Sequence, residues 1–380
     1  MNVLVISHTY ISPINRLKWQ ELAKQHKDVQ LTVLVPNRWK TSFFDITSGD
    51  LSRDSFRHCR FISLPAYATG NELLYFYAPL KFAKLLHQVK PDIIHVEQGL
   101  HAVSYFQAIA VNTILRIKAR CCFFTWVNWQ PQLGFKTKIF TKIMEFFNIR
   151  GSTGAIAGNN DAKTFLTTTK STLSVMVLPQ LGVNTKLFRP ALPTEIEDQK
   201  KIAYIGRITE EKGLESLVKA FVHIAAEFID WNLVIIGAGD YEKQLIDYTL
   251  SKKLLQRIEF QPPVSHEKIA TLMRTVDILV LPSIDKSDWR EQFGHVLIEA
   301  MACKVCVVGS NAGEIPNVIA DAGIIFQQGD ELALYKALHT LITQPTLRKN
   351  LAQKGFDRVM QEYTHSVIAE KTYTFWQSLL

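Results

Sequence analysis

The sequence predicts an α/β protein made of two doubly wound units that follow one another along the chain. Apolar, strand-like runs alternate with amphipathic helical stretches, which is typical of parallel sheets covered by helices on both faces. Three prolines and a polar, acidic segment interrupt this rhythm between Leu178 and Lys200. We therefore expect one Rossmann-like domain at 1–185 and a second at 186–360, with a final helix at 361–380 that packs back on the first.

The strands of both predicted domains follow from short apolar runs. The first run, NVLVIS, begins at Asn2, without the basic region and cleavage site of a signal peptide. The other runs of the first domain are VQLTVLVP, RFISLP, DIIHVE, CCFFTWV and GAIAG. The second domain begins again with KIAYIGR and continues with WNLVIIG, IEFQPP, DILVLPS, KVCVVGS and AGIIF. No window reaches about 18 uninterrupted apolar residues, so we expect no membrane-spanning helix.

The cysteines favour a reducing, cytoplasmic location. There are five, an odd number, and they show no metal-ligand pattern. Cys303 and Cys306 form a C-x-x-C pair, but they lie where a helix ends and a buried strand begins. We therefore expect a structural role for this pair rather than a redox or zinc site.

The charge is unevenly distributed between the halves. Residues 1–190 carry 23 Lys and Arg against 10 Asp and Glu, a net +13, and residues 191–380 carry 20 against 25, a net −5. A basic first half attracts an anionic partner such as a membrane face, a lipid phosphate or an acidic glycan. A solvated basic face without a partner is the alternative. We expect no nucleic-acid partner, because no recognisable reading motif is present.

The first candidate site residues follow the strand AYIG. The strand ends at Gly206, Arg207 follows, and Lys212 precedes an amphipathic helix. Two cations and a helix N-terminus at one strand end suit a phosphate or diphosphate. Solvated cations without a ligand remain the alternative.

The stretch REQFGHVLIEAMA carries two glutamates eight positions apart. Glu291 lies in a loop before a predicted helix, and Glu299 lies about a turn and a half inside it. The backbone N–H groups of Gly294, His295 and Val296 begin that helix and suit anionic or hydroxyl oxygens. Glu299 interrupts an apolar pattern, so it either binds a ligand or forms an ion pair with a neighbouring Lys or Arg.

A third loop, GSNAGE, follows the strand VCVV, so three strand ends converge on one predicted site. The Gly237-Ala238-Gly239 turn is no dinucleotide fingerprint, because Glu242 stands where the third glycine is required.

Five motifs in order give the chain a family resemblance: YIGRITEEKG, LVIIGAGDYEKQL, VDILVLPS, EQFGHVLIEAMA and VVGSNAGEIPNVI. With them the chain resembles the retaining GT-B glycosyltransferases of the glycosyltransferase group 1 family, family four of the usual classification. The resemblance covers essentially the whole second half and matches the first half more loosely. It implies two Rossmann-like domains facing across a cleft, with the acceptor on the first domain and a nucleotide-diphosphate sugar on the second.

The resemblance also implies roles for individual residues. Arg207 and Lys212 would bind the donor diphosphate, Glu291 would bind hydroxyls of the transferred sugar, and Glu299 would bind the ribose. Gly206 and the backbone of Gly294, His295 and Val296 would bind donor oxygens. Val264 would lie near the base. The implied reaction transfers a sugar from a UDP- or GDP-type donor to a glycan, lipid or small-molecule hydroxyl. The departing phosphate takes the acceptor proton, so we expect no metal and no cofactor.

The acceptor side departs from the family pattern. The first loop, SHTYISPINR, lacks the usual glycine pair, and Trp126, Asn128 and Trp129 stand where many members have a histidine. Our acceptor-side candidates are His8, His95, Glu97 and Asn128. For His8, His95 and Glu97 the alternative is a purely structural role.

The stretch FKTKIFTKIMEFFNIR sets apolar residues among lysines. Such a basic amphipathic helix either lies on an anionic leaflet or packs on the sheet. The first interpretation predicts peripheral association with the inner membrane face.

Two other functions remain open. A nucleotide-sugar 2-epimerase has the same fold, and a non-catalytic protein that binds nucleotide sugars is a different class altogether. Products formed from donor alone would indicate the first, and binding without turnover the second.

Overall fold

The computed structural model describes residues 1–41, 45–49, 51, 58–127, 134–192 and 200–380. The chain forms two compact units. The first unit comprises Met1–Gly182 together with His365–Leu380, and the second comprises Val183–Thr364. The chain thus leaves the first unit after Gly182 and returns to it for the final helix.

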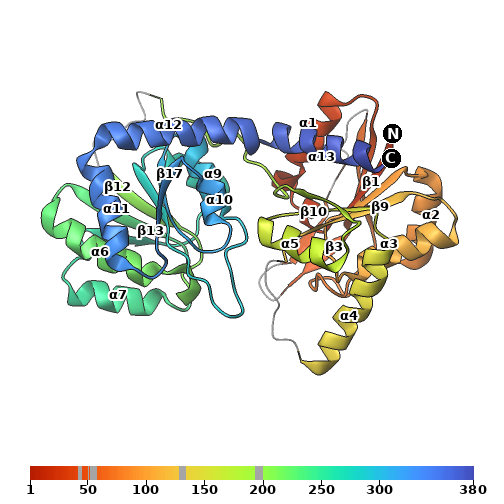
Figure 1. Cartoon of the computed structure of the whole chain (residues 1–380), viewed down its shortest axis with the longest axis horizontal. Coiled ribbons are helices and arrows are strands. Elements are labelled where there is room, and N and C mark those ends of the chain that lie inside the picture. The colour runs from red at the N-terminus through yellow and green to blue at the C-terminus, as the bar shows by residue number, and fades with distance from the viewer. Residues whose placement is uncertain (42–44, 50, 52–57, 128–133, 193–199) are drawn as a thin grey trace. The chain divides into compact units, whose positions relative to one another are not determined.

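The first unit is built on a seven-stranded parallel sheet of order β11-β10-β9-β8-β1-β2-β5. Its strands are β1 (Asn2–Ile6), β2 (Gln30–Pro36), β5 (Cys59–Leu64), β8 (Ile93–Val96), β9 (Arg120–Thr125), β10 (Gly154–Ala157) and β11 (Ser174–Val177). Strands β1, β9 and β10 of this sheet are labelled in Figure 1. Two antiparallel hairpins accompany it, β3 (Arg38–Lys40) with β4 (Asp45–Thr47), and β6 (Ala66–Tyr67) with β7 (Phe76–Tyr77). Six of the seven sheet strands fall on the predicted runs. The edge strand β11 was missed, because its four residues follow a polar Thr/Ser/Lys segment and are only partly buried.

The helices of the first unit connect these strands. They are α1 (Leu17–Gln25), α2 (Pro79–Val89), α3 (Val103–Ile114), α4 (Phe135–Arg150), α5 (Asn160–Thr169) and α13 (His365–Leu379), with short 3-10 helices η1 (Thr9–Ile11) and η2 (Pro13–Arg16). Helix α13 packs against α1, where the rings of Trp19 and Trp376 stack with centroids 5.6 Å apart. Both indoles are fully buried, so the last residues of the chain complete the core of the first unit.

The second unit is built on a six-stranded parallel sheet of order β14-β13-β12-β15-β16-β17. Its strands are β12 (Lys200–Ile205), β13 (Trp231–Ile236), β14 (Ile258–Gln261), β15 (Ile278–Leu281), β16 (Cys306–Ser310) and β17 (Gly323–Phe326). Its helices are η5 (Glu210–Lys212), α6 (Leu214–Glu227), α7 (Glu242–Ser251), α8 (His266–Met273), α9 (His295–Ala302), α10 (Ile315–Ile319), α11 (Glu331–Thr343) and α12 (Pro345–Glu362). All six strands fall on the predicted runs.

Each sheet reverses its strand order once. In the first unit β1 pairs with both β2 and β8, and in the second β12 pairs with both β13 and β15. In doubly wound sheets a ligand binds beside the carboxyl ends of the strands at this reversal. The carboxyl ends of β12 and β15 are therefore the first place to look for a site in the second unit.

The five cysteines lie in the protein interior, which favours the structural role expected for Cys303 and Cys306. All five are buried and none forms a disulfide. Burial raises the pKa of the Cys303 and Cys306 thiols to about 12. Within the described ranges, no helix combines the length and the apolar character needed to cross a membrane.

Candidate functional site

The predicted residues of the second unit gather where three neighbouring strands end. Gly206 follows β12, Ser283 lies two residues beyond β15, and Ser310 ends β16. The hydroxyl of Ser310 donates to the carbonyl of Ser283 at 2.5 Å, which joins two of these strand ends directly. The three loops whose convergence the sequence suggested thus form one contiguous region.

Lys212 and Glu291 form the central ion pair of this region. The Lys212 Nζ lies 2.6 Å from Oε2 of Glu291, and the Ser283 hydroxyl donates to the same oxygen at 2.8 Å. The ammonium also lies 4.6 Å from the ring centroid of Trp289. Glu291 is only 8 % exposed. The pair therefore fixes the position of a cation at the carboxyl edge of the sheet.

Two glycines allow the backbone to close around this pair. Gly213 has φ +67° and Gly313 has φ +48°, in the left-handed region that favours glycine. A Cβ at Gly213 would lie 2.0 Å from the carbonyl oxygen of Pro282, and one at Gly313 would lie 2.1 Å from that of Glu291. The Glu314 N–H donates to the same Glu291 carbonyl at 3.1 Å. The GSNAGE loop thus holds the backbone of Glu291, a role that the sequence did not reveal.

Helix α9 begins beside Glu291. Its N-cap, Gly294, has φ +82°, and a Cβ there would lie 2.7 Å from Cδ2 of Leu281. His295 and Val296, the first two residues of the helix, are half-buried. The positive end of the helix dipole therefore lies at the carboxyl edge of the sheet, next to the Lys212–Glu291 pair.

Glu299, inside α9, is held by a residue that sequence reasoning missed. His266 Nε2 lies 2.8 Å from Oε1 of Glu299. The hydrogen bond to Glu299 raises the pKa of His266 above its ordinary value. The ring of Phe188 packs edge-on against the imidazole, with centroids 4.8 Å apart. The partner of Glu299 is thus a histidine rather than the Lys or Arg that the sequence offered as the alternative.

His266 begins α8 in the loop that also carries Val264, the predicted base contact. Val264 is half-buried, and the hydroxyl of Ser265 caps α8 by accepting from the Lys268 N–H at 3.4 Å. His266 lies 33 positions from Glu299, and no local pattern joins them. This pairing places the β14–α8 loop beside α9.

Arg207 differs from Lys212 in its exposure. Its side chain is 64 % exposed and lies 3.5 Å from Glu211, while its carbonyl accepts a 2.6 Å hydrogen bond from the Tyr204 hydroxyl. Burial alone would raise the pKa of Glu211, but hydrogen bonds and the charges of Arg207 and Lys212 lower it. Both cations therefore lie near one carboxylate, with Arg207 extending into solvent.

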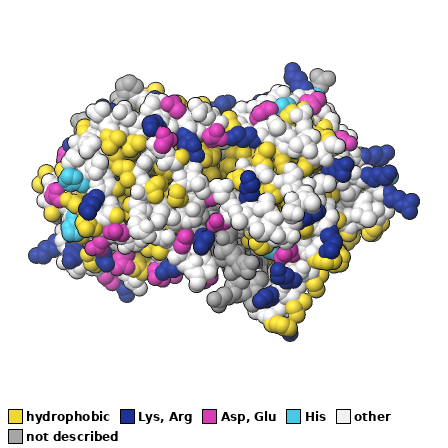
Figure 2. All heavy atoms as spheres, viewed as in Figure 1, with side chains coloured by type: hydrophobic (Ala, Val, Ile, Leu, Met, Phe, Trp, Pro, Cys, Tyr) yellow, Lys and Arg dark blue, Asp and Glu magenta, His cyan; other side chains and the backbone are white. Residues whose placement is uncertain are grey.

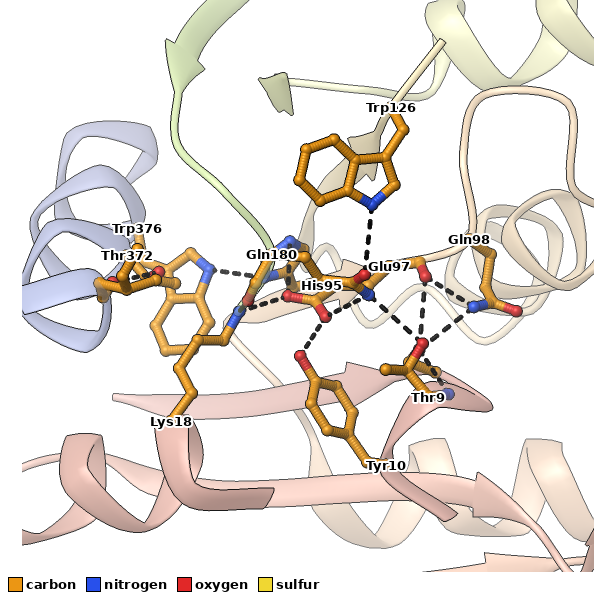
Figure 3. A network of polar contacts seen from close by, with 12 residues as sticks. Thr9, Tyr10, Lys18, His95, Glu97, Gln98, Trp126, Gln180, Thr372 and Trp376 are labelled. Atoms are coloured by element: carbon orange, nitrogen blue, oxygen red, sulfur yellow. Dashed lines mark hydrogen bonds and ion pairs between the residues drawn. The ribbon is translucent and has the colours of Figure 1, made fainter. Parts of the chain in front are cut away.

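In the first unit, the prediction that His95 and Glu97 face a ligand is wrong. Both side chains are completely enclosed, and Glu97 belongs to a buried network (Figure 3). Lys18 Nζ donates to Oε1 of Glu97 at 2.7 Å, and Tyr10 and Gln180 donate to Oε2. Burial would raise the pKa of Glu97, yet the charge of Lys18 leads the interactions that lower it. These groups neutralise one another inside the protein.

His95 is bound to the final helix. The Trp376 indole N–H donates to Nδ1 of His95 at 3.2 Å (Figure 3), and burial lowers the pKa of His95 to about 4. A buried, neutral imidazole that accepts a hydrogen bond from α13 has a structural role. This is the structural role that the sequence offered as the alternative, and it fits β8 as a strand with every residue buried.

His8 remains accessible among the acceptor-side candidates. Its ring stacks on Trp39 with centroids 4.2 Å apart, its Nδ1 contacts Gln98, and its Nε2 lies 3.4 Å from Glu72. The side chain is 16 % exposed. Asn128 lies outside the described residues. Among the residues that the structure describes, no three His, Cys, Asp or Glu side chains cluster as metal ligands would.

Part of the chain is similar in sequence to known proteins. Residues 190–358 match the sequence model of the family described as "Glycosyl transferases group 1". A GDP-mannose-dependent monoacylated alpha-(1-6)-phosphatidylinositol monomannoside mannosyltransferase from Corynebacterium glutamicum is 27 % identical over 210 residues, 52 % of this chain and 55 % of that protein. A phosphatidyl-myo-inositol mannosyltransferase from Mycobacterium leprae is 32 % identical over 183 residues, 47 % of each chain. The matches span about half the length of these relatives.

Among solved structures, the Anabaena protein HepE in complex with UDP superposes with a TM-score of 0.75 at 18 % identity, covering 100 % of both chains. The same protein has also been solved with UDP-glucose. This similarity shows the class of fold: the chain is a GT-B protein with two Rossmann-like halves. The residues that match the group 1 family model, 190–358, include the Lys212–Glu291 pair.

Proposed function

We propose that the protein is a retaining glycosyltransferase that moves a sugar from a nucleotide-diphosphate donor to a hydroxyl acceptor. The observation that carries the proposal is the Lys212–Glu291 pair at the carboxyl edge of a family-matched sheet, beside the N-terminus of α9. A fixed cation, a helix dipole and two carboxylates suit a ligand that joins a diphosphate to hydroxyl-rich sugars. The names of the relatives and the UDP complexes of HepE support a GDP- or UDP-type donor.

In this proposal Lys212 and Arg207 act on the leaving group. The bond between the anomeric carbon and the phosphate oxygen breaks, and negative charge develops on the departing diphosphate. Cations that are already positioned stabilise that charge without reorganising during the reaction. Lys212 is held by Glu291 before the donor arrives, while Arg207 is free to move from solvent onto the outer phosphate oxygens.

The acceptor oxygen attacks the same face of the sugar that the phosphate leaves. The new bond forms between this oxygen and the anomeric carbon, and the acceptor proton passes to the departing phosphate oxygen. The step requires neither a metal nor a protein base, so we assign Glu291 to the hydroxyls of the transferred sugar instead. Gly206 and the backbone of Gly294, His295 and Val296 contribute to donor binding.

Glu299 is assigned to the ribose. His266 occupies Oε1, and the proposal gives the other carboxylate oxygen to the ribose hydroxyls. The position of Val264 in the same loop as His266 supports its assignment to the base. His266 is a positioning residue here, because it acts through the orientation of Glu299.

For the acceptor we propose a lipid-linked hydroxyl met at the cytoplasmic face of a membrane, with glycans and small molecules as the alternatives. The names of both mannosyltransferase relatives include a phosphatidylinositol, which supports the lipid class. His8 and Asn128 remain our acceptor-side residues.

Thermal-shift measurements with UDP, GDP, ADP and their sugars test the donor assignment. A cognate donor at 100 times its Kd should stabilise the protein by about 2.7 kcal/mol. Glu299→Ala should abolish the selective shift, while Lys354→Ala, which removes an exposed cation of the same unit paired with Asp321, should preserve it. The absence of a shift with every nucleotide would contradict the proposal.

Product analysis then separates the possible activities. The selected donor is incubated with and without lipid, glycan and small-molecule acceptors. A glycoside that forms only with an acceptor, and retains the anomeric configuration of the donor, supports the proposal. A changed sugar released from donor alone would assign a 2-epimerase, and binding without any turnover would assign a non-catalytic protein.

A further inference from the structure

Helix α4 of the first unit directs its apolar side chains into solvent. It extends from the rest of this unit, and hydrophobic atoms line it beside Lys and Arg (Figures 1 and 2). The exposed fractions are 79 % for Phe135, 45 % for Ile139, 46 % for Ile143, 50 % for Phe146 and 47 % for Phe147. At 100° per residue these five positions share one side of the helix, an arc of roughly 120°. The alternative that they pack on the sheet is wrong.

The opposite side of α4 is attached to the unit by Ile149, which is buried in the hydrophobic core, and by polar contacts. The buried Asn148 side chain donates to the carbonyls of Leu100 and Ala102 at 2.6 and 3.2 Å. Glu145 lies 3.5 Å from His101. A helix of a soluble protein normally buries its apolar side and exposes its polar side. In α4 five large apolar side chains are exposed instead, which indicates a partner for this apolar face.

The charges of α4 indicate what kind of partner this is. The helix carries four cations, Lys136, Lys138, Lys142 and Arg150, against one carboxylate, Glu145, a net +3. The Lys142 side chain is 67 % exposed, and the Arg150 guanidinium lies 3.6 Å from the ring centroid of Phe146. Lys138 and Lys142 border the same hollow as the exposed apolar side chains. Cations that flank an apolar face place their stems on it and their charges at its rim.

We propose that α4 binds the anionic leaflet of a membrane. The five apolar side chains enter the boundary between headgroups and acyl chains, and the Lys and Arg side chains contact lipid phosphates. A second copy of the chain fits this face less well, because two helices of net +3 would meet like charge with like charge. The proposal rests on α4 alone and does not depend on the chemistry assigned to the second unit.

Vesicle sedimentation of the full chain tests this surface. We expect binding to vesicles of phosphatidylcholine with phosphatidylglycerol, and at least tenfold weaker binding to phosphatidylcholine alone. Because a lysine near an anionic surface contributes about 1 kcal/mol, Lys138→Gln with Lys142→Gln should weaken the partition coefficient about 30-fold. The matched control, Lys349→Gln with Lys354→Gln on α12, removes the same charge from the second unit and should have little effect.

The apolar contribution is tested by Ile139→Ser with Ile143→Ser. Both side chains are exposed, so the melting temperature should stay within about 2 °C of the parent while vesicle binding falls at least tenfold. Lys212→Ala should bind vesicles like the parent chain, which separates this proposal from the proposed transferase activity. Equal and negligible binding to both vesicle types would overturn the proposal. Dimers in sedimentation velocity that the serine variant dissociates, without vesicle binding, would assign the face to a second copy instead.

Discussion

Replacing Lys212 by alanine removes the cation that Glu291 holds at the carboxyl edge of the second sheet. The ammonium lies 2.6 Å from Glu291 Oε2 and 4.6 Å from the ring of Trp289. Losing one preorganised group that stabilises developing charge costs about 3–4 kcal/mol of the activation barrier. We therefore expect kcat to fall roughly 10²- to 10³-fold, with a smaller change in KM.

The same change leaves the Glu291 carboxylate without its counter-ion. Breaking a fully buried pair costs about 3–5 kcal/mol. Here the two side chains are 13 % and 10 % exposed and the Ser283 hydroxyl still donates to the carboxylate, so we expect about 2–3 kcal/mol. For a unit of this size, that loss of stability should lower the melting temperature by roughly 4–12 °C.

A double-mutant cycle separates the two effects. The variants are Lys212→Ala, Glu291→Gln and their combination, measured by urea unfolding and by initial rates with the donor selected in the thermal-shift screen. The coupling in stability should be about 1–3 kcal/mol, because the two groups are in direct contact. Lys354→Ala serves as control, since its exposed ion pair with Asp321 contributes little to stability.

Two results would refute this reasoning. If Lys212→Ala lost stability but kept kcat within about twofold, the ammonium would not act on the leaving group. If the coupling free energy between Lys212 and Glu291 were zero, the ion pair would not hold the Lys212 ammonium in place when the protein is in solution.

Three further predictions concern other features. Gly313→Ala should destabilise the second unit by more than about 1 kcal/mol and lower turnover, because its Cβ would lie 2.1 Å from the Glu291 carbonyl; an unchanged melting curve would contradict this. Glu97→Ala should lower the free energy of unfolding by about 3–5 kcal/mol, because it leaves the buried Lys18 without its counter-ion. The pKa of Glu97 is lowered in the folded protein, so the stability that its carboxylate contributes should be lost as pH falls below 4.5. Melting temperatures of the wild type and Glu97→Gln, compared across this pH range, measure that loss. Glu299 raises the pKa of His266 in the folded protein, so wild type should be more stable than His266→Asn by a few tenths of a kcal/mol at low pH. This difference in stability should be complete below pH 6.5 and vanish as pH rises through the raised pKa of His266. A difference that does not depend on pH would argue against this.

The strands could be predicted because their signals are local. An apolar run of four to seven residues reports burial on both faces of a parallel sheet, whatever its neighbours are. Strand β11 was missed because it lies at an edge and is partly exposed. The loops with Gly206, Glu291 and Gly313 could be placed at one edge for the same reason, since parallel strands end on the same side.

The partners of the site residues could not be predicted in this way. Lys212 meets Glu291 across 79 positions of the chain, and His266 meets Glu299 across 33. Which side chains meet depends on strand order, and the order β12-β15-β16 is set by crossover connections rather than by local pattern. The hydrogen bond between His95 and Trp376 likewise joins residues 281 positions apart, so no local pattern indicated it.

The sequence by itself determined two doubly wound units, the edge of the second sheet where the site lies, and the amphipathic character of α4. Only the tertiary structure decided that Glu97 is neutralised inside the first unit, that Lys212 and His266 hold the two glutamates, and that α4 turns its apolar face outward. The physical reason is that periodicity reports which residues share a face, whereas burial and pairing depend on what the rest of the chain brings against that face.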